Sequence, residues 1–230
     1  MTRNGRNRTT SRGAALAASA IFVLAIAGPA AAQTALSPEQ KAAEASSAWA
    51  DLRPDLFGDR ELVEGTDTIA IEAPKRATDP AIVPVTLSFD PKMDVRKVTL
   101  VIDENPSPVA ATFEFAQGAD IRTLSTRVRV NAYTDIHAVA ETADGKLFVT
   151  KTFVKAAGGC AAPAAKDPEV AAKEMGKMKM RQFDADGASV HEAQLMIRHP
   201  NNSGLQKDQV TLLYIPAHFV TELEIDKGGQ

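Results

Sequence analysis

This 230-residue chain has a single cysteine, Cys160, and its thiol is a candidate for covalent chemistry. It lies in a segment, residues 155–166, that contains no bulky apolar side chain and so has little surface to bury. Gly158 and Gly159 directly precede the cysteine and give the backbone conformational freedom. We therefore predict an exposed, mobile arm with a thiol at its centre.

An exposed thiol on such an arm suits covalent carriage. The thiolate is the reactive form, and a free cysteine has a pKa of about 8.5. Lys155 and Lys166 flank Cys160, and nearby cations favour the thiolate, although only slightly at an exposed site. Such a thiolate could attack an oxidised sulfur species or a disulfide and present the adduct to successive enzymes. Gly158 and Gly159 would let the partners' active sites close around the backbone. From these residues alone, an incidental linker cysteine explains the pattern about equally well.

Four methionines near the end of the chain could bind a soft metal ion. We favour a packing role instead, because thioethers fill cores well and the alternate spacing is that of one face of a strand. These methionines are Met175, Met178, Met180 and Met196.

Other reactive side chains lack the spacing of a catalytic or metal site. Asp103 and Glu104 are expected in a solvated turn before Asn105. No serine–histidine–aspartate order, phosphate loop or paired-carboxylate motif stands out. We therefore predict no catalytic residue, no metal site and no cofactor. The four histidines, which are not spaced as metal ligands, are His137, His191, His199 and His218.

Composition excludes several classes of protein. The formal net charge of −3 argues against a nucleic-acid binder, which needs a clustered basic surface. One cysteine rules out an intrachain disulfide and a cysteine-rich metal cluster. Charged residues make up 24% of the chain and hydrophobic ones 44%, as in ordinary globular proteins.

Residues 1–32 have the pattern of a secretory signal peptide. A basic head precedes an apolar run over residues 14–28, and Ala30-Ala31-Ala32 offers a cleavage site. The run is too short for a comfortable membrane span, so we expect no span after cleavage. The mature chain then carries 22 basic and 29 acidic side chains, a net charge of −7. We expect a periplasmic location, where a lone cysteine is notable because the compartment is oxidising.

A short helix is expected at the start of the mature chain. Ser37, Pro38 and Gln40 have the order of an N-cap, a first-position proline and a capping-box partner. An alanine-rich stretch continues the helix through Trp49, and Pro54 should end it.

The next part of the chain predicts an all-β, immunoglobulin-like antiparallel sandwich. Apolar and polar residues alternate in short runs with no long helix between them. Asp144-Gly145, between the last two runs, is a strong hairpin signal. The runs are 83–89, 98–102, 113–115, 128–130, 136–142 and 147–154.

A second β segment is expected from Lys177, after a brief helix capped by Asp167 that ends near Gly176. Its 54 residues are few for an independent domain, so it should dock on the first half, pair with another chain or be incomplete. We expect an exposed sheet edge or poor order after Phe219. The expected strands lie around 178–180, 195–199, 210–214 and 219–225, with a turn at Asp186-Gly187.

These patterns divide the chain into four parts. They are a signal peptide over 1–32, a sandwich domain over 33–154, a flexible arm and linker over 155–176, and a partial β domain over 177–230.

Two motifs resemble known subunits. The segment 154–160, which ends in Gly158-Gly159-Cys160, resembles the carboxy-terminal arm of SoxY, the sulfur carrier of periplasmic thiosulfate oxidation. The segment 195–204 contains His199, Pro200 and Gly204 and resembles the His-Pro-x-x-(Ser/Thr)-Gly stretch of the partner subunit SoxZ. Residues 215–219 resemble a later stretch of SoxZ. Together they resemble the fused SoxYZ-like carriers associated with quinoprotein dehydrogenases.

The sequence departs from this family in two places. Ala161-Ala162-Pro163 replaces the terminal glycines, and the arm is tethered at both ends, which shortens its reach. The SoxZ-like half lacks the later strands of a complete sandwich, so we expect an incomplete second sandwich.

The resemblance implies a non-enzymatic carrier that holds a sulfur-containing intermediate on Cys160. Its implied partners are periplasmic oxidoreductases: a quinoprotein dehydrogenase, a cytochrome c and Sox-type enzymes. Self-association through the incomplete second domain is a further expectation. One alternative is a periplasmic interaction or maturation module for such a dehydrogenase, with a dispensable thiol. A thiol enzyme or a copper-binding protein is less favoured, because no general base lies near Cys160 in the sequence.

Overall fold

The computed structural model describes residues 38–65, 67–162, 168–183, 191–208 and 210–226. The predicted signal peptide, Ser37, Asp167 and the Asp186-Gly187 turn lie outside these ranges. None of the described helices is both long and apolar enough to cross a membrane.

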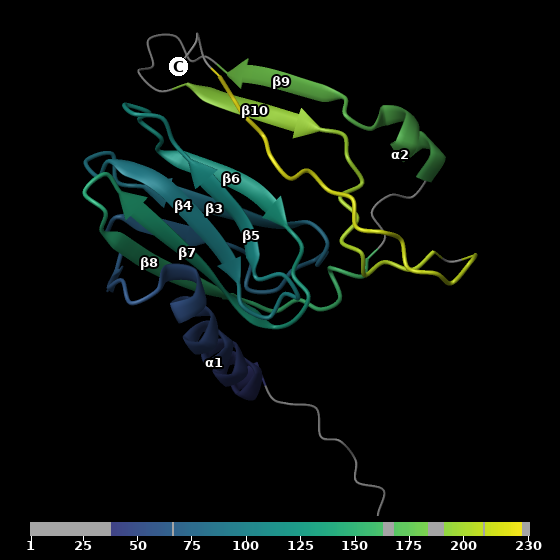
Figure 1. The fold of residues 1–230 in the computed structure, drawn as a ribbon, viewed down its shortest axis with the longest axis horizontal. Coiled ribbons are helices and arrows are strands. Elements are labelled where there is room, and N and C mark those ends of the chain that lie inside the picture. Colours follow the sequence, from purple (N-terminus) through teal and green to yellow (C-terminus); the bar gives the residue numbers. More distant parts are fainter. Residues whose placement is uncertain (1–37, 66, 163–167, 184–190, 209, 227–230) are drawn as a thin grey trace, which may run out of the picture. The chain divides into compact units, whose positions relative to one another are not determined.

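Eight strands of the first half form two sheets (Figure 1). A five-stranded sheet has the order β1-β8-β7-β4-β5, and a three-stranded sheet has the order β2-β3-β6. All pairings within them are antiparallel except that of β1 with β8, which is parallel. The strands are β1 (Leu62–Glu64), β2 (Ile69–Glu72), β3 (Val83–Phe89), β4 (Val95–Ile102), β5 (Val109–Glu114), β6 (Thr123–Val128), β7 (Thr134–Thr142) and β8 (Leu147–Val154).

The core lies between the two sheets and follows from the alternation in the sequence. Successive side chains of a strand point to opposite faces, so every second residue can be buried. In β3 the buried residues are Val83, Val85, Leu87 and Phe89, and the residues between them are exposed or half-buried. β4 and β7 contribute matching sets from the other sheet. The prediction of an all-β sandwich is confirmed.

The hairpin at Asp144-Gly145 is confirmed as well. It joins β7 to β8, and Gly145 adopts a φ of 81°, which favours glycine. The turn closes when the Thr142 amide donates to the Lys146 carbonyl at 3.1 Å.

Helix α1 (Pro38–Phe57) begins at the predicted proline but does not end at Pro54. It continues for another turn and ends at Gly58, whose amide donates to the Pro54 carbonyl at 2.9 Å and whose φ is 63°. Pro54 has no amide to donate to the carbonyl four residues earlier, so the helix passes through it with one backbone hydrogen bond missing. The predicted helix end was therefore wrong by one turn.

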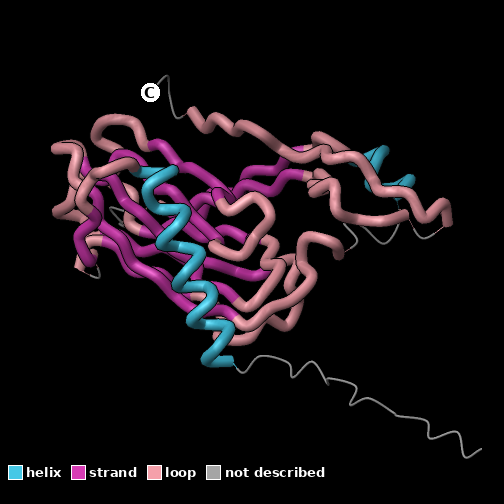
Figure 2. The backbone as a smooth tube through the Cα atoms, turned by 60° about the horizontal axis from the view of Figure 1, so that its bottom comes forward, coloured by secondary structure: helices cyan, strands magenta, loops and turns pink. Residues whose placement is uncertain are grey.

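α1 covers the outer face of the five-stranded sheet (Figure 2). Trp49 stacks on His137 of β7, with ring centroids 3.8 Å apart and an interplanar angle of 9°. Trp49 and Phe57 pack with Leu62 on a second apolar cluster, formed by Val139, Leu147 and Val149. The helix therefore gives the five-stranded sheet a second buried face.

The second half contains α2 (Pro168–Glu174) and an antiparallel hairpin of β9 (Met178–Phe183) and β10 (Glu192–Ile197). These elements agree with the predicted brief helix and first two strands. All six residues of β9 are exposed, so Met178 and Met180 do not pack in a core as the favoured reading expected.

The two further predicted strands are wrong. In the described part of the chain after Ile197 only isolated β-bridges occur, Asn202 to His218 and Lys207 to Tyr214. Apolar side chains of 210–226 are largely exposed. An apolar run becomes a strand only where a neighbouring segment accepts a continuous row of its backbone hydrogen bonds. Among the described residues, 213–215 pair with 206–208 through isolated hydrogen bonds only.

Leu100 tests the sandwich core. It is fully buried in β4, so Leu100→Ala should lower the free energy of unfolding by about 3 kcal/mol. Leu213→Ala is the control, because Leu213 is 69% exposed and should change stability by less than about 0.5 kcal/mol. Urea unfolding followed by far-UV circular dichroism measures both. Equal losses in the two variants would contradict this core.

Candidate functional site: the Cys160 turn

Cys160 lies in a tight turn fastened to the first half of the chain. The Gly158 amide donates to the Asn131 carbonyl at 2.7 Å, and the Gly159 amide donates to the Val130 carbonyl at 3.1 Å. Upstream, the Lys155 amide donates to the Lys75 carbonyl at 3.0 Å. The segment from Lys155 to Cys160 therefore follows the edge of the sandwich.

Gly159 is the tightest point of this turn. A Cβ atom on Gly159 would lie 2.1 Å from the Pro80 carbonyl oxygen and 2.5 Å from that of Val130. Both distances are far inside van der Waals contact, so only glycine fits here. Gly158 is required for a different reason, since its φ of 75° is in the left-handed region but the space around it is open.

Arg129 clamps the turn from the side. Its Nη1 donates to the Gly159 carbonyl at 2.7 Å and to the Ala162 carbonyl at 3.2 Å. Asn105 supports the backbone beneath it: the Asn105 amide group donates to the Arg129 carbonyl at 2.8 Å and accepts from the Asn131 amide at 2.9 Å. The Arg129 guanidinium therefore binds carbonyl groups on both sides of Cys160. Asn105 in turn fixes the backbone of Arg129 and Asn131.

Ser203, from the SoxZ-like motif, reaches the cysteine itself. Its hydroxyl donates to the Cys160 carbonyl at 2.5 Å. The Ser203 amide donates to Oε1 of Gln206 at 2.8 Å, and Gln206 is only 1% exposed. The second half of the chain thus contributes a direct contact to the thiol-bearing residue.

The predicted SoxZ-like residues lie together behind Ser203. His199 and His218 form an edge-on ring pair with centroids 4.8 Å apart. The Asn202 and His218 backbones exchange hydrogen bonds of 2.8 and 2.9 Å. A Cβ atom on Gly204 would lie 3.3 Å from the Ala217 side chain. The structure therefore joins two motifs that are separate in the sequence, and it places Pro200 half-buried between His199 and the bridge.

The prediction of an exposed arm is wrong at Cys160 itself, which is only 7% exposed. Gly159 is buried too, whereas Gly158 is exposed as expected. Burial raises the pKa of the Cys160 thiol, and the positive charge of Arg129 opposes this only in part. Among the described residues, the cation that acts on the thiol is Arg129, and the effect of burial on the pKa is larger than that of Arg129. Lys166 lies outside the described residues.

Sequence reasoning missed four residues of this site: Asn105, Arg129, Asn131 and Ser203. Arg129 stands between Val128 and Val130 in a strand-like alternation, which marks it as a surface residue and gives no hint of the cysteine 31 positions on. The only available signal was Ser203 itself, which lies within the SoxZ-like motif.

Two family models match this chain. The model for the sulfur oxidation protein SoxY matches residues 53–160, and the model for the sulphur oxidation protein SoxZ matches residues 177–230. The two matches follow one another in tandem, and the first ends at Cys160. The chain is a fused SoxYZ-like protein. The two matches relate the chain to a family of sulfur-oxidation carriers.

Solved structures similar to the SoxYZ-like protein include a carrier. The sulfur carrier protein SoxY from Chlorobium limicola f thiosulfatophilum is 27% identical, with a TM-score of 0.43, over 50% of this chain and 96% of that one. A superoxide reductase (neelaredoxin) from Ignicoccus hospitalis is 16% identical, with a TM-score of 0.34, over 38% of this chain and 79% of that one. No curated protein matches the chain.

Gly159→Ala tests the close approach of the turn in the SoxYZ-like protein. The added methyl group cannot fit against the Pro80 and Val130 carbonyls, so the turn should detach and Cys160 should react faster with iodoacetamide, by about tenfold or more. Stability should fall by about 1–3 kcal/mol. Gly158→Ala is the control: it meets no neighbour and carries only backbone strain of about 1 kcal/mol. Equal alkylation rates in Gly159→Ala and the parent protein would contradict the packed turn.

The raised pKa of Cys160 predicts a pH dependence. The alkylation rate should reach half its maximum at a higher pH in the folded protein than in the chain unfolded by urea. A raised folded pKa also means that the stability linked to the buried thiol is full below the unfolded pKa and is lost as pH rises through the folded pKa. Cys160→Ser should remove this alkaline loss. A folded midpoint at or below the unfolded one would contradict the burial.

Proposed function

We propose that this protein is a periplasmic thiol carrier that holds a sulfur-containing intermediate covalently on Cys160. The observation that carries the proposal is that the SoxY match ends at the chain's single cysteine, and that Ser203 of the SoxZ-like half donates a hydrogen bond to the backbone carbonyl of that cysteine. A carrier needs one defined attachment atom, and Cys160 offers the only thiol in the sequence.

Loading can proceed by thiol exchange without an added oxidant. The Cys160 thiol loses its proton, and the thiolate sulfur forms a bond to one sulfur of a disulfide or polythionate. The original sulfur–sulfur bond breaks and its electron pair leaves with the second sulfur, as a thiolate or as thiosulfate. The adduct remains on Cys160 as a new sulfur–sulfur bond, and the reverse exchange unloads it.

The closed turn must open for this exchange. Cys160 is buried and its thiol is held in the protonated form, so the described state protects the thiol more than it presents it. Opening requires breaking the Ser203–Cys160 hydrogen bond and the Arg129 contacts. We propose that a partner enzyme competes for these groups when it docks.

The proposed partners are periplasmic oxidoreductases, namely a quinoprotein dehydrogenase, a cytochrome c or Sox-type enzymes. This assignment rests on the SoxYZ-like resemblance and on the signal-peptide pattern of residues 1–32. The protein itself would perform no catalysis, since the chemistry of loading and unloading would lie with the partners.

The burial of Cys160 favours a second candidate. A thiol that is only 7% exposed suits a structural residue of an interaction or maturation module for such a dehydrogenase, with the β surfaces binding the partner. The two functions differ in whether the sulfur atom is needed.

Cys160→Ser separates the two candidates. The parent protein incubated with tetrathionate should gain a single adduct that dithiothreitol removes, and Cys160→Ser should gain none, as read by intact mass spectrometry. Protein isolated from the host periplasm should carry a reducible adduct on Cys160. An unmodified native thiol, together with full partner activity in a Cys160→Ser strain, would establish the module instead.

Ser203→Ala tests the cover over the thiol. It removes the hydroxyl that holds the Cys160 carbonyl, so adduct formation should become about threefold to tenfold faster while the fold stays intact. Thr211→Ala is a matched control, because the Thr211 hydroxyl bonds only within its own turn: it donates to Asp208 and accepts from the Leu213 amide. Slower loading in Ser203→Ala would mean that the serine assists the exchange and does not restrain it.

A further inference from the structure

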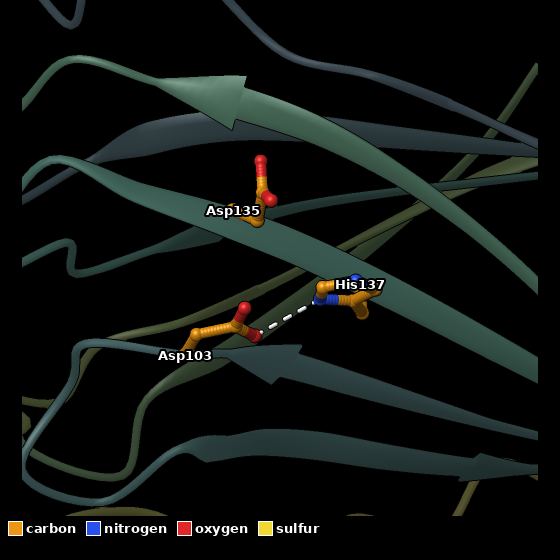
Figure 3. A group of neighbouring side chains, drawn as sticks. All are labelled: Asp103, Asp135 and His137. Carbon is orange, nitrogen blue, oxygen red and sulfur yellow. Dashed lines mark hydrogen bonds and ion pairs between the residues drawn. The ribbon is translucent and has the colours of Figure 1, made fainter. Parts of the chain in front are cut away.

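A cluster of three ionisable side chains lies buried on the outer face of the five-stranded sheet, among residues that the proposed carrier function does not use. Asp103 follows the end of β4, and Asp135 and His137 lie two residues apart on the neighbouring strand β7 (Figure 3). One ligand atom from each lies within 4.8 Å of the other two. Asp103 was expected in a solvated turn, yet its side chain is fully buried.

The cluster is only partly satisfied. Oδ1 of Asp103 lies 3.0 Å from Nδ1 of His137, but Oδ2 of Asp103 is buried without a hydrogen-bond partner among the described residues. An unpaired buried carboxylate oxygen is costly, because it has lost its water and gained nothing in return. Lys151 Nζ binds Oδ2 of Asp135 at 2.8 Å. Lys151 therefore pairs with the Asp135 carboxylate, while Oδ2 of Asp103 stays without a hydrogen-bond partner among the described residues.

We infer that Asp103, Asp135 and His137 form a binding site for a divalent transition-metal ion of the zinc type. One imidazole nitrogen and two carboxylate oxygens are ligands that Zn²⁺ accepts, and a fourth position would remain open. The unpaired oxygen of Asp103 would gain a cation, and the imidazole edge would be fixed by the same ion.

The distances suit such an ion after small side-chain rotations. Two ligands of a tetrahedral zinc with bonds of about 2.0–2.1 Å lie about 3.3 Å apart. The Asp103 and His137 atoms are already 3.0 Å apart, and no pair in the cluster exceeds 4.8 Å. Because Asp135 and His137 project from the same strand on the same face, turning either side chain brings them closer without moving the backbone.

Two neighbours bear on the site. Trp49 of α1 stacks on the face of the His137 ring, which leaves the edge nitrogens to the cluster. Lys151 opposes a cation because its ammonium group already holds Asp135, so metal binding must displace it or bind beside it. The affinity should therefore rise when Lys151 loses its charge.

Trp49 gives the site a built-in reporter, because it is the only tryptophan in the chain. We would titrate the full chain, made without a polyhistidine tag and treated with a chelator, with Co²⁺ and then with Zn²⁺. Co²⁺ bound to His137 should quench Trp49 fluorescence, saturate at one ion per chain and be displaced by Zn²⁺. Binding at surface sites would leave Trp49 unchanged, and that result would overturn the inference.

Variants locate the ligands. Asp103→Asn and His137→Gln should weaken the Co²⁺ affinity by about tenfold or more, whereas Lys151→Gln should strengthen it. Asp94→Asn is the control, because Asp94 is an exposed carboxylate whose ion pair with Arg96 lies outside the cluster. Unchanged affinity in Asp103→Asn would overturn the inference. If Asp103→Asn does not fold, the parent titration and Lys151→Gln still decide the question, since weaker binding in Lys151→Gln would also contradict it.

Discussion

The close approach of Gly159 to the Pro80 and Val130 carbonyls is the constraint on which the functional end of the molecule depends. A side chain at this position would hold the turn away from the sandwich, and Arg129 could no longer reach the Gly159 and Ala162 carbonyls. Because Gly159 has no Cβ, a segment without bulky apolar side chains can still be anchored to the sandwich. Backbone hydrogen bonds fix this turn, whereas buried apolar side chains stabilise the sandwich core.

This anchoring sets the chemical state of the thiol. Burial disfavours the thiolate, and Arg129 offsets the effect only in part, so the closed turn stores Cys160 in its less reactive form. For the proposed periplasmic carrier this state would have an advantage, because an unprotected thiol reacts with any oxidant it meets. The selectivity of such a carrier would depend on which partner can open the turn, and less on the nucleophilicity of the sulfur.

The sequence predicted what local periodicity controls and failed where distant segments meet. The alternation in β3 and the Asp-Gly pair before β8 encode strands and a turn within a few residues, and both were confirmed. Cys160 was placed in an exposed arm because apolar content is a guide to side-chain burial, not to backbone packing around a glycine. Asp103 was expected in solvent because the residues around it in the sequence are typical of a turn, whereas its burial depends on the distant strand β7, whose His137 and Asp135 lie beside it. Residues 210–225 show the converse: apolar alternation forms no strand where no neighbouring strand is placed.

The turn after β4 supports both polar sites of the sandwich. Asn105 bonds the Arg129 carbonyl and the Asn131 amide, which lie under the Cys160 turn, while Asp103, two residues earlier, faces His137. The Glu104 amide between them donates to Thr134 Oγ1 at 3.0 Å, which ties the same turn to β7. Asn105 and Asp103 therefore serve different sites. The Asn105 amide group bonds backbone groups of residues that hold the Cys160 turn, whereas the Asp103 carboxylate bonds the side chain of His137. Changing the Asp103 carboxylate therefore leaves every hydrogen bond beneath Cys160 in place, and a loss at Asn105 removes two of them at once.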